Sequence, residues 1–341
     1  MYNFKNDYSV GSHPNILNKL IETNLEPQLG YGEDTYTLEA KEIIRKKVNN
    51  PKADVFLLTG GTQTNLIVIS FLLRPHEAVI SAKTGHISAN ETGAIEATGH
   101  KVVTVDTENG KLNPKHIQKA LNEHLNKPHV VKPRMVYISN STEIGSIYTK
   151  KELTELSSFC KSNNLFLYLD GARLGHALTS SENDLTLIDI AQLTDVFYIG
   201  ATKNGALLGE AVIFNTPYLG LDFQLALKQK GALLAKGRLL AIQFIELFKD
   251  DLYFILADHA NKMAMKLAYA IQGNGYSFLT KPVSNQIFPI LPKELITKLS
   301  NKYLFYVWKE VDENLSAIRL IASWATDEKM VDELINDIKQ I

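Results

Sequence analysis

The stretch Leu165-Phe-Leu-Tyr-Leu-Asp-Gly-Ala-Arg173 decides the fold class of this chain of 341 residues. Its apolar run has the length and the aliphatic and aromatic content of a buried strand, and it ends at Asp170. A second apolar run, Val196–Ile199, ends shortly before Lys203. Lys203 follows Asp170 by 33 residues, which leaves room for a crossover through a helix at Asp184–Leu193. We therefore expect an α/β fold whose parallel sheet carries an acid and a lysine at its strand ends.

The occurrence of Asp170 and Lys203 at two strand ends has two alternative interpretations. A buried lysine near positive charge favours the neutral amine, which is the nucleophile that forms a Schiff base. A carboxylate beside it could hold a proton on a pyridine nitrogen and turn that ring into an electron sink. The alternative is an ordinary ion pair at two strand ends. The pair by itself leaves both interpretations open.

The composition predicts a soluble globular protein of about two domains, with 45% hydrophobic and 21% charged residues and a formal net charge of −1. This balance argues against a nucleic-acid surface or a membrane anchor, and no apolar run approaches the ~18 residues of a membrane span. The start of the chain lacks a hydrophobic signal region, and a single cysteine, Cys160, excludes an intramolecular disulfide. We therefore expect a reducing, cytoplasmic compartment. The nine histidines show no ligand-like spacing, so we expect no metal site.

The stretch Gly60-Gly-Thr-Gln-Thr-Asn65 lies between a predicted strand, Asp54–Thr59, and a predicted apolar helix, Leu66–Leu73. Glycines and hydroxyl residues at a helix start are typical of an anion cradle, because free backbone N–H groups and the helix dipole favour a phosphate. The stretch is neither a Walker loop nor GxGxxG, so both nucleotide fingerprints are absent. An ordinary helix cap after a turn is the alternative. The double glycine before Thr-Gln-Thr-Asn favours the phosphate.

Three further polar residues follow or interrupt predicted strands. His86 lies just beyond the strand Ala78–Ser81, where its ring could cover a planar cofactor, although a lone histidine is more often a helix cap or a structural hydrogen-bonder. Glu143 follows the strand Arg134–Ser139 and is a third acid or base candidate, with a turn cap as the alternative. Arg319 interrupts an apolar strand. A half-buried arginine favours a bidentate carboxylate, either from the protein or from an amino-acid substrate.

The chain divides into three predicted parts. Residues 1–34 are polar and irregular and indicate an N-terminal arm and loop, which could lie over a site, grip a second subunit, or do both. Residues 35–250 alternate strands and helices. Residues 251–341 indicate a small α+β domain, in which we expect a strand at Asn285–Leu291. A long helical region from Leu221 to Gln272 joins the last two parts.

A phosphate cradle, a strand-end carboxylate, a strand-end lysine and a C-terminal arginine follow one another in this order. With these motifs the chain resembles the threonine aldolase/β-eliminating lyase group, which has the aspartate-aminotransferase fold (fold type I). The resemblance covers essentially the whole length and is most specific at Gly60–Asn65, Leu169–Arg173 and Thr202–Gly205. It implies pyridoxal 5'-phosphate as cofactor. It also implies a large domain with a mainly parallel seven-stranded sheet and a small α+β C-terminal domain.

The resemblance implies a role for each cofactor-binding residue. Lys203 would hold pyridoxal phosphate covalently, and Asp170 would pair with its ring nitrogen. Arg173 would contact the ring hydroxyl or its surroundings. His86 would stack on the ring face and help in proton transfer. The residues implied at the phosphate are Gly61, Thr62 and, nearby, Thr202.

On the substrate side, the resemblance implies that Arg319 binds the carboxylate. The chain departs from the family at two positions. Many members have a histidine that contacts the substrate hydroxyl where this chain has Glu143, and a serine near the N-terminus where Asn6 falls. A carboxylate can still act as a base, but it changes charge and reach at the position that contacts the substrate side chain.

The implied activity is cleavage of a 3-hydroxy amino acid, for example threonine, to glycine and an aldehyde. Two alternatives stay open: β-elimination or transamination with the same cofactor, and a non-catalytic interaction protein that kept the fold. Family members are dimers or tetramers with shared active sites. In such an assembly Lys236 or Arg238 would serve the neighbouring subunit's phosphate.

Overall fold

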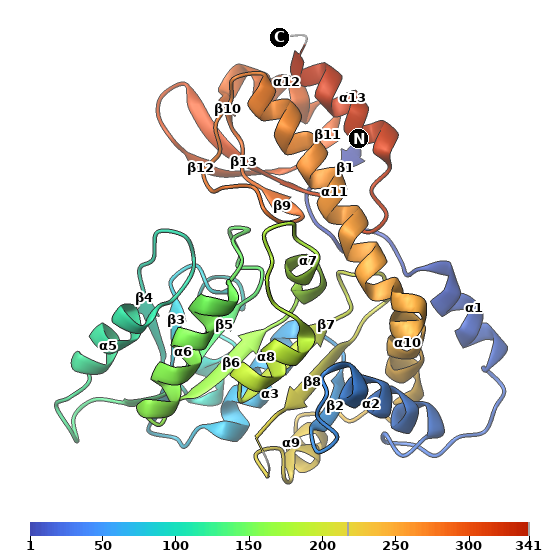
Figure 1. The fold of residues 1–341 in the computed structure, drawn as a ribbon, viewed down its shortest axis with the longest axis vertical. Coiled ribbons are helices and arrows are strands. Elements are labelled where there is room, and N and C mark those ends of the chain that lie inside the picture. Colours follow the sequence, from blue (N-terminus) through green and yellow to red (C-terminus); the bar gives the residue numbers. More distant parts are fainter. Residues whose placement is uncertain (217, 340–341) are drawn as a thin grey trace.

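The computed structural model describes residues 1–216 and 218–339, and its larger part is built on a central sheet (Figure 1). The strands of this sheet are β2 (Asp54–Leu58), β3 (Glu77–Ala82), β4 (Val102–Val105), β5 (Lys132–Ser139), β6 (Phe166–Asp170), β7 (Val196–Gly200) and β8 (Glu210–Phe214). They pair in the order β2-β8-β7-β6-β5-β3-β4. Only β8 runs against its neighbours in this described sheet. The predicted seven-stranded, mainly parallel sheet is confirmed.

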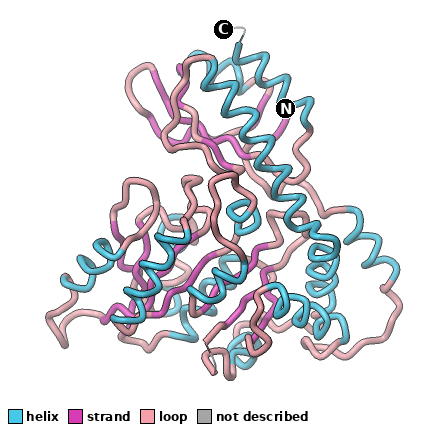
Figure 2. Tube along the Cα trace, viewed as in Figure 1, coloured by secondary structure: helices cyan, strands magenta, loops and turns pink. Residues whose placement is uncertain are grey.

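Helices cover both faces of this sheet (Figure 2), and each face has its own hydrophobic cluster. The first face carries α2 (Thr35–Lys47), α5 (Pro114–Asn122), α6 (Lys150–Ser162), α8 (Leu187–Leu193) and α10 (Arg238–Phe248). The second face carries α3 (Gly61–Leu72), α4 (His86–Ala89) and α9 (Phe223–Gln229). Because both faces are buried, the strands appear in the sequence as nearly continuous apolar runs.

Side chains alternate between the two faces along each strand. In β5, Val136 and Ile138 belong to the cluster of the first face, whereas Met135 and Tyr137 belong to the cluster of the second. Tyr198 of β7 also lies on the second face. Three tyrosine side chains, Tyr137 of β5, Tyr168 of β6 and Tyr198 of β7, therefore lie on the side that α3 covers.

Two helices begin at residues other than those expected. Helix α3 starts at Gly61 rather than Leu66, so the Gly-Gly-Thr stretch forms its first turn and Gly60 is its extended N-cap residue. Helix α8 starts at Leu187 rather than Asp184 because Thr186 caps it, with a reciprocal hydrogen bond between the backbone and side chains of Thr186 and Asp189.

The smaller part of the structure combines a mixed set of short strands with three helices. Its strands are β9 (Gln286–Ile287), β10 (Ile290–Pro292), β11 (Tyr303–Leu304), β12 (Tyr306–Glu310) and β13 (Leu315–Ile321), and its helices are α11 (Leu252–Gly273), α12 (Lys293–Ser300) and α13 (Glu328–Lys339). β13 lies in the middle, between β12 and the β9 and β10 strands. The expected single strand Asn285–Leu291 is wrong. The chain instead forms β9 and β10, separated around Pro289, whose ring nitrogen carries no hydrogen to donate to a ladder.

The N-terminal segment differs from the irregular arm that we expected. β1 (Tyr2–Asn3) pairs in parallel with β11, so the N-terminus lies beside the smaller part (Figure 1). Further along, α1 (Pro14–Glu22) is a regular helix with a proline in its first turn, and the side chain of His13 accepts a hydrogen bond from the Asn15 N–H. The polar stretch concealed this helix because only one side of it, around Ile16, is buried.

The expected continuous helical region from Leu221 to Gln272 is also interrupted. It forms α9, α10 and α11, with a non-helical segment around Gly231 and a second break before α11. At the second break Asp250 and Asp251 have left-handed backbone angles, which end a regular helix. Among the helices of the described residues, none has both the length and the apolar character that crossing a membrane requires.

Candidate active site

A cavity of about 430 Å³ lies where three segments of the chain meet. The strand ends of the large sheet and the loops after them contribute His86, Glu143, Arg173 and Lys203, whereas the smaller part contributes Arg319. The remaining lining residues come from the N-terminal segment, from the loop after α4 and from the smaller part: Tyr8, Asn90, Gln286, Tyr306, Val307 and Trp308. The structure thus brings together five side chains that the sequence analysis singled out from distant positions.

Lys203 lies in the turn after β7, at the carboxyl end of the parallel strands. Burial lowers the pKa of its amine, and the nearby charge of Arg173 lowers it further. Asp7 and Asp170 act in the opposite direction, but the pKa still lies below the ordinary lysine value. A lysine in such surroundings has more of its neutral, nucleophilic form than an exposed lysine does.

Asp170 ends β6 and is only 4% exposed. The hydroxyls of Tyr137 and Tyr198 each donate a hydrogen bond of 2.5 Å to its carboxylate, one to each oxygen. The Ala172 N–H and the Asn65 amide donate two more, at 3.0 and 3.1 Å. Burial acts to raise the pKa of Asp170, but the nearby His86 ring, in its protonated form, and the hydrogen bonds from Tyr137, Tyr198 and Ala172 outweigh it, so the pKa is lowered. Asp170 is therefore held as an anion.

The first turn of α3 lies close to Asp170. A Cβ atom on Gly61 would come within 3.1 Å of the Tyr198 hydroxyl, which itself bonds Asp170, so a larger residue would crowd this hydroxyl. Gly60 has no atom within 4 Å of its own Cβ position. Space beside free backbone N–H groups at a helix start suits an anion.

The hydroxyl of Thr202, which precedes Lys203, forms two hydrogen bonds within the chain. It donates to Glu210 at 2.9 Å and accepts from the Gly209 N–H at 3.0 Å. Glu210 starts β8 and is buried, and its second carboxylate oxygen has no partner among the described residues. Burial raises the pKa of Glu210 to about 8, although the bond from Thr202 and the charge of Lys203 act against this rise. Burial therefore favours the protonated form of Glu210.

His86 opens α4 and is held at both its ring and its backbone. Its Nδ1 lies 2.7 Å from Oε1 of Glu91, and its backbone N–H donates to Oε1 of Glu143 at 2.9 Å. The Asn65 amide donates to the same Glu91 oxygen at 2.7 Å and also to Asp170. A buried chain of polar groups therefore joins His86 to the carboxylate that ends β6.

Glu143 combines features of both interpretations suggested by the sequence. It caps a backbone N–H of His86 and accepts a hydrogen bond of 2.6 Å from the Ser139 hydroxyl, yet it also lines the cavity beside Lys203. Burial raises the pKa of Glu143, the Ser139 bond lowers it, and the charge of Asp170 raises it again, with a net increase.

Arg173 is engaged by Asp7 in a two-point ion pair. Asp7 also accepts a hydrogen bond of 2.9 Å from Asn285, so the N-terminal segment joins both parts of the structure here. Burial acts to raise the pKa of Asp7, but the Arg173 guanidinium outweighs it and holds this pKa well below its usual range.

Arg319 lies across the cavity on β13, directly opposite Tyr306 of β12. Its guanidinium carbon is 5.0 Å from the Tyr306 ring centre and 5.1 Å from that of Trp308, so two aromatic rings hold it. Its Nε atom has no hydrogen-bond partner among the residues that the structure describes. Burial and the charge of Arg173 lower the pKa of this guanidinium. Its donors suit a carboxylate that enters the cavity.

Several predicted site residues do not line the cavity. Asn6 binds only the Tyr8 N–H, at 3.1 Å, while its neighbours Asp7 and Tyr8 reach the site. The others that the cavity lining does not include are Asp170, Gly61, Thr62 and Thr202. Of these, Asp170 is joined to His86 through Asn65 and Glu91, and Gly61 lies beside the Tyr198 hydroxyl that bonds Asp170. Thr202 precedes Lys203 in the chain.

Sequence reasoning missed the polar residues that support the predicted ones. They are Asp7, Asn65, Glu91, Tyr137, Tyr198 and Glu210. Asn65 ends the Gly-Gly-Thr stretch and Glu91 follows His86 by five residues, so both lay within motifs that were already under consideration. The tyrosines gave no separate signal because their strands are apolar runs in which a tyrosine is an ordinary core residue.

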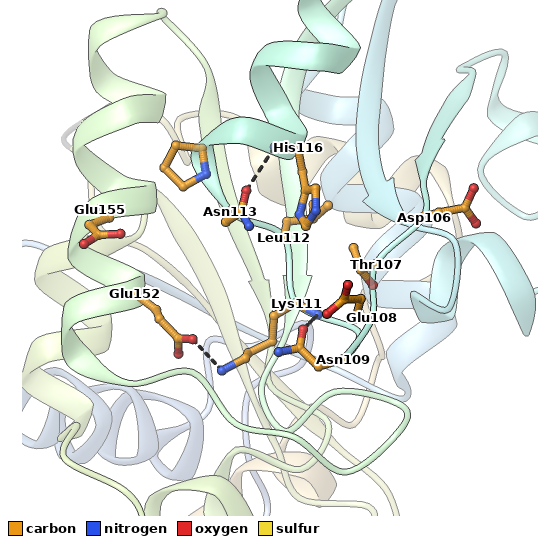
Figure 3. Close-up of a pocket in the computed structure, with 11 residues that line it drawn as sticks. Asp106, Thr107, Glu108, Asn109, Lys111, Leu112, Asn113, His116, Glu152 and Glu155 are labelled. Atoms are coloured by element: carbon orange, nitrogen blue, oxygen red, sulfur yellow. Dashed lines mark hydrogen bonds and ion pairs between the residues drawn. The ribbon is translucent and has the colours of Figure 1, made fainter. Parts of the chain in front are cut away.

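A second cavity, of about 580 Å³, lies beside α6 and the segment after β4 (Figure 3). Four carboxylates line it, namely Asp106, Glu108, Glu152 and Glu155. Lys111 is paired with Glu152 at 2.6 Å. This excess of negative charge would repel a phosphate or a carboxylate, and no group of side chains that could hold a metal ion occurs in the described part of the chain. The cavity around Lys203 is therefore the better candidate.

The fold agrees with comparisons to known proteins. An aspartate aminotransferase from Thermus thermophilus has a TM-score of 0.74 at 13% identity, covering 100% of this chain and 91% of that chain, and therefore has the same fold. The class is thus fold type I. Residues 8–291 match the model of the beta-eliminating lyase family, and the chain belongs to this family.

Two relatives are similar over their whole length. Low specificity L-threonine aldolase from Pseudomonas aeruginosa is 32% identical, across 99% of this chain and 97% of that protein. The structure of a threonine aldolase from Leishmania major is 48% identical, with a TM-score of 0.98, and covers 100% of this chain and 99% of that chain.

Proposed function

We propose that this protein is a pyridoxal-phosphate-dependent lyase that cleaves a 3-hydroxy amino acid of the threonine type into glycine and an aldehyde. One observation carries the proposal: a single cavity contains the half-buried Lys203 and Arg319, whose Nε has no partner among the described residues, with the anionic Asp170 next to it. The family of the chain and the names of its full-length relatives support the same activity.

The side chains present fit pyridoxal phosphate. Lys203 would hold the cofactor, because its lowered pKa favours the amine that reacts with an aldehyde. Asp170 would face the ring nitrogen, because its hydrogen bonds keep it charged. The first turn of α3, with Gly61 and Thr62, would receive the phosphate. When bound, the cofactor supplies a ring that accepts the electron pair of the bond broken at Cα.

The remaining residues would orient the substrate and move a proton. Arg319 would bind the substrate carboxylate with its guanidinium, whose Nε has no partner among the described residues. His86 and Glu143 both line the cavity, and either could receive the proton of the substrate hydroxyl. Arg173 would act near the cofactor or the substrate carboxylate while Asp7 fixes its orientation.

The alternatives with the same cofactor are β-elimination and transamination. The carbon–carbon lyase is favoured because two groups able to accept a proton lie in the cavity in addition to Lys203. An interaction protein without activity would have no need to retain a half-buried lysine, a charged buried aspartate and an arginine with an unpartnered Nε together.

A substrate panel tests the proposed function. Purified protein with added pyridoxal phosphate is incubated with threonine, allo-threonine, phenylserine, serine and alanine, and the products are identified by mass spectrometry. We expect glycine and the matching aldehyde from the 3-hydroxy amino acids. Ammonia with a keto acid would indicate elimination, and a keto acid with aminated cofactor would indicate transamination. No product from any of them would contradict the proposal.

We also propose a homodimer or homotetramer with shared active sites. Apolar side chains at the end of α1 and in the loop after it are exposed, among them Ile21, Leu25 and Leu29. Arg238 donates to the backbone carbonyls of Thr23 and Glu26, so it holds this loop within its own chain. Lys236 is exposed and is therefore the better candidate for a neighbouring subunit's phosphate.

We further propose a cytoplasmic location for this enzyme. The one cysteine, Cys160, is a buried free thiol, and burial raises its pKa to about 12. Such a thiol stays in its reduced form in a reducing compartment.

A further inference from the structure

Glu91 is a buried acid next to the cavity for which the proposed function gives no role. It lies in the loop after α4, and its side chain is 0% exposed. One of its oxygens, Oε1, accepts hydrogen bonds from both the His86 ring and the Asn65 amide, each at 2.7 Å. The other oxygen has no partner among the described residues. Oε1 of Glu91 is therefore the acceptor for both the His86 ring and the Asn65 amide.

The contact with Glu91 determines which nitrogen of the His86 ring carries the proton. Oε1 already receives the Asn65 N–H, so it acts as an acceptor, and the ring nitrogen facing it must donate. Nδ1 of His86 consequently bears the hydrogen, and Nε2 is left with a free lone pair. The His86 side chain is 33% exposed and lines the cavity, so this lone pair is accessible to a ligand there.

We propose that Glu91 is a positioning residue that fixes His86 in the Nδ1–H tautomer, so that Nε2 is the atom that receives the proton of the substrate hydroxyl. This inference rests on the proposed function for its catalytic part, whereas the tautomer follows from the contacts alone. In the step, the O–H bond breaks and an N–H bond forms at Nε2. The O–H electron pair becomes the second bond of the aldehyde carbonyl, and the Cα–Cβ electron pair stays on Cα. The imidazolium that results lies against the Glu91 carboxylate.

A purely structural role for Glu91 is the competing explanation, because the same carboxylate also satisfies the Asn65 amide. Asn65 in turn bonds Asp170, so a change at Glu91 could act through that carboxylate instead of through His86. Asp170 keeps three other hydrogen bonds, from Tyr137, Tyr198 and Ala172. The two routes differ in the visible absorption of the bound cofactor. An effect through Asp170 would alter this absorption, because Asp170 would face the ring nitrogen, whereas an effect through His86 would leave it unchanged.

The experiment measures the tautomer and the kinetics separately on the cofactor-loaded protein. Histidine labelled with ¹⁵N in the ring is incorporated, and the His86 signal is assigned by its loss in His86→Asn. The variants are Glu91→Ala, which removes the acceptor, and Glu91→Gln, which keeps an acceptor oxygen without the charge. Glu96→Gln is the matched control, because Glu96 is an exposed glutamate five residues further on.

We expect wild type and Glu96→Gln to have the proton of His86 on Nδ1. We expect Glu91→Ala to shift it towards Nε2 and to lower kcat for threonine cleavage by ~100-fold, with KM changed by less than about threefold. Glu91→Gln should keep the tautomer and recover part of kcat. If Glu91→Ala does not fold, Glu91→Gln still decides, because we expect its kcat to lie about tenfold below wild type.

Three results would overturn the inference: a wild-type His86 with its proton on Nε2, an unchanged kcat in Glu91→Ala despite a changed tautomer, or wild-type kcat in Glu91→Gln. Failure of the proposed function has a different signature. In that case the wild-type protein would cleave no 3-hydroxy amino acid, while the NMR signal of His86 would still report its tautomer.

Discussion

Asp7 and Arg173 form a two-point ion pair between the N-terminal segment and the end of β6. Nε of Arg173 lies 2.7 Å from Oδ2 of Asp7, and one terminal nitrogen lies 3.0 Å from Oδ1. The Asp7 side chain is fully buried and that of Arg173 is 11% exposed. Two-point geometry fixes the plane of the guanidinium, so the N-terminal segment determines how Arg173 is presented to the cavity.

Asp7→Asn should destabilise the protein because it leaves the positive charge of Arg173 buried without its partner. Breaking a buried pair by removing one side costs about 3–5 kcal/mol. Urea unfolding at neutral pH measures this loss, with Asn6→Ala as the control at a position that makes only a local hydrogen bond. A loss below ~1 kcal/mol for Asp7→Asn would mean that water reaches Arg173 and replaces the carboxylate.

The protein should purify yellow, because a covalent link between Lys203 and pyridoxal phosphate extends the conjugation of the ring into the visible range. Reduction with borohydride should attach the cofactor permanently to a peptide that contains Lys203, as peptide mass spectrometry can establish. Lys236, which is exposed, is the internal comparison. Attachment to any other lysine, or absence of bound cofactor, would contradict the central assignment.

Asp170→Asn should preserve the fold and most of the cofactor content while lowering turnover by at least ~100-fold. An amide cannot hold a ring nitrogen protonated by charge, and losing a buried charge interaction of this kind is worth roughly 3–5 kcal/mol. The measurement is kcat at saturating cofactor, together with the melting temperature. Unchanged turnover in a fully loaded variant would remove Asp170 from the mechanism.

Glu143→Gln distinguishes a base from a supporting residue. Oε1 of Glu143 already accepts hydrogen bonds from His86 and Ser139, and a glutamine can keep both. Since we assign the proton to Nε2 of His86, we expect threonine cleavage to fall by less than about tenfold. Exchange of the glycine α-proton provides the control, because it involves no hydroxyl. A fall beyond ~100-fold in cleavage, with exchange retained, would instead make Glu143 the base.

His176 should make the protein sensitive to acid. It is fully buried on α7 (Leu174–Leu178), and neither ring nitrogen has a hydrogen-bond partner among the described residues. Burial lowers its pKa from 6.5 to about 4, with Asp7 acting to raise it and Arg173 and Lys203 to lower it. The unfolded chain therefore binds this proton more readily than the folded one. The stability that the neutral His176 ring contributes is fully present above pH ~6.5 and is lost as the pH falls towards 4.

His176→Phe removes the titrating ring and keeps a similar volume. Between pH 7 and pH 4.5, the variant should lose about 2–3 kcal/mol less stability than wild type, as measured by urea unfolding at both pH values. His129, an exposed histidine, supplies the control substitution. Parallel losses in wild type and His176→Phe would show that another group causes the acid sensitivity.

The sequence was informative wherever a local pattern has one physical cause. Apolar runs predicted the strands of the central sheet because both of its faces are covered by helices. Polar residues at the ends of these runs, Asp170 and Lys203, were recognised because the carboxyl ends of parallel strands meet at one edge. Element boundaries were less certain: α1 and the division of the 221–272 region depend on one-sided burial and on left-handed residues, which an apolar pattern does not reveal.

The supporting residues of the site were decided only by the tertiary structure. Asp7 meets Arg173 across 166 residues of sequence, and Asn65 meets Asp170 across 105. No local periodicity encodes such contacts, since they arise when β1 pairs with β11 and when α3 covers the second face of the sheet. The sequence by itself therefore indicated the residues that we propose carry the chemistry. Folding determined their charge and orientation, because burial and long-range hydrogen bonds set the pKa of Lys203, Asp170 and Glu143 only after distant segments have come together.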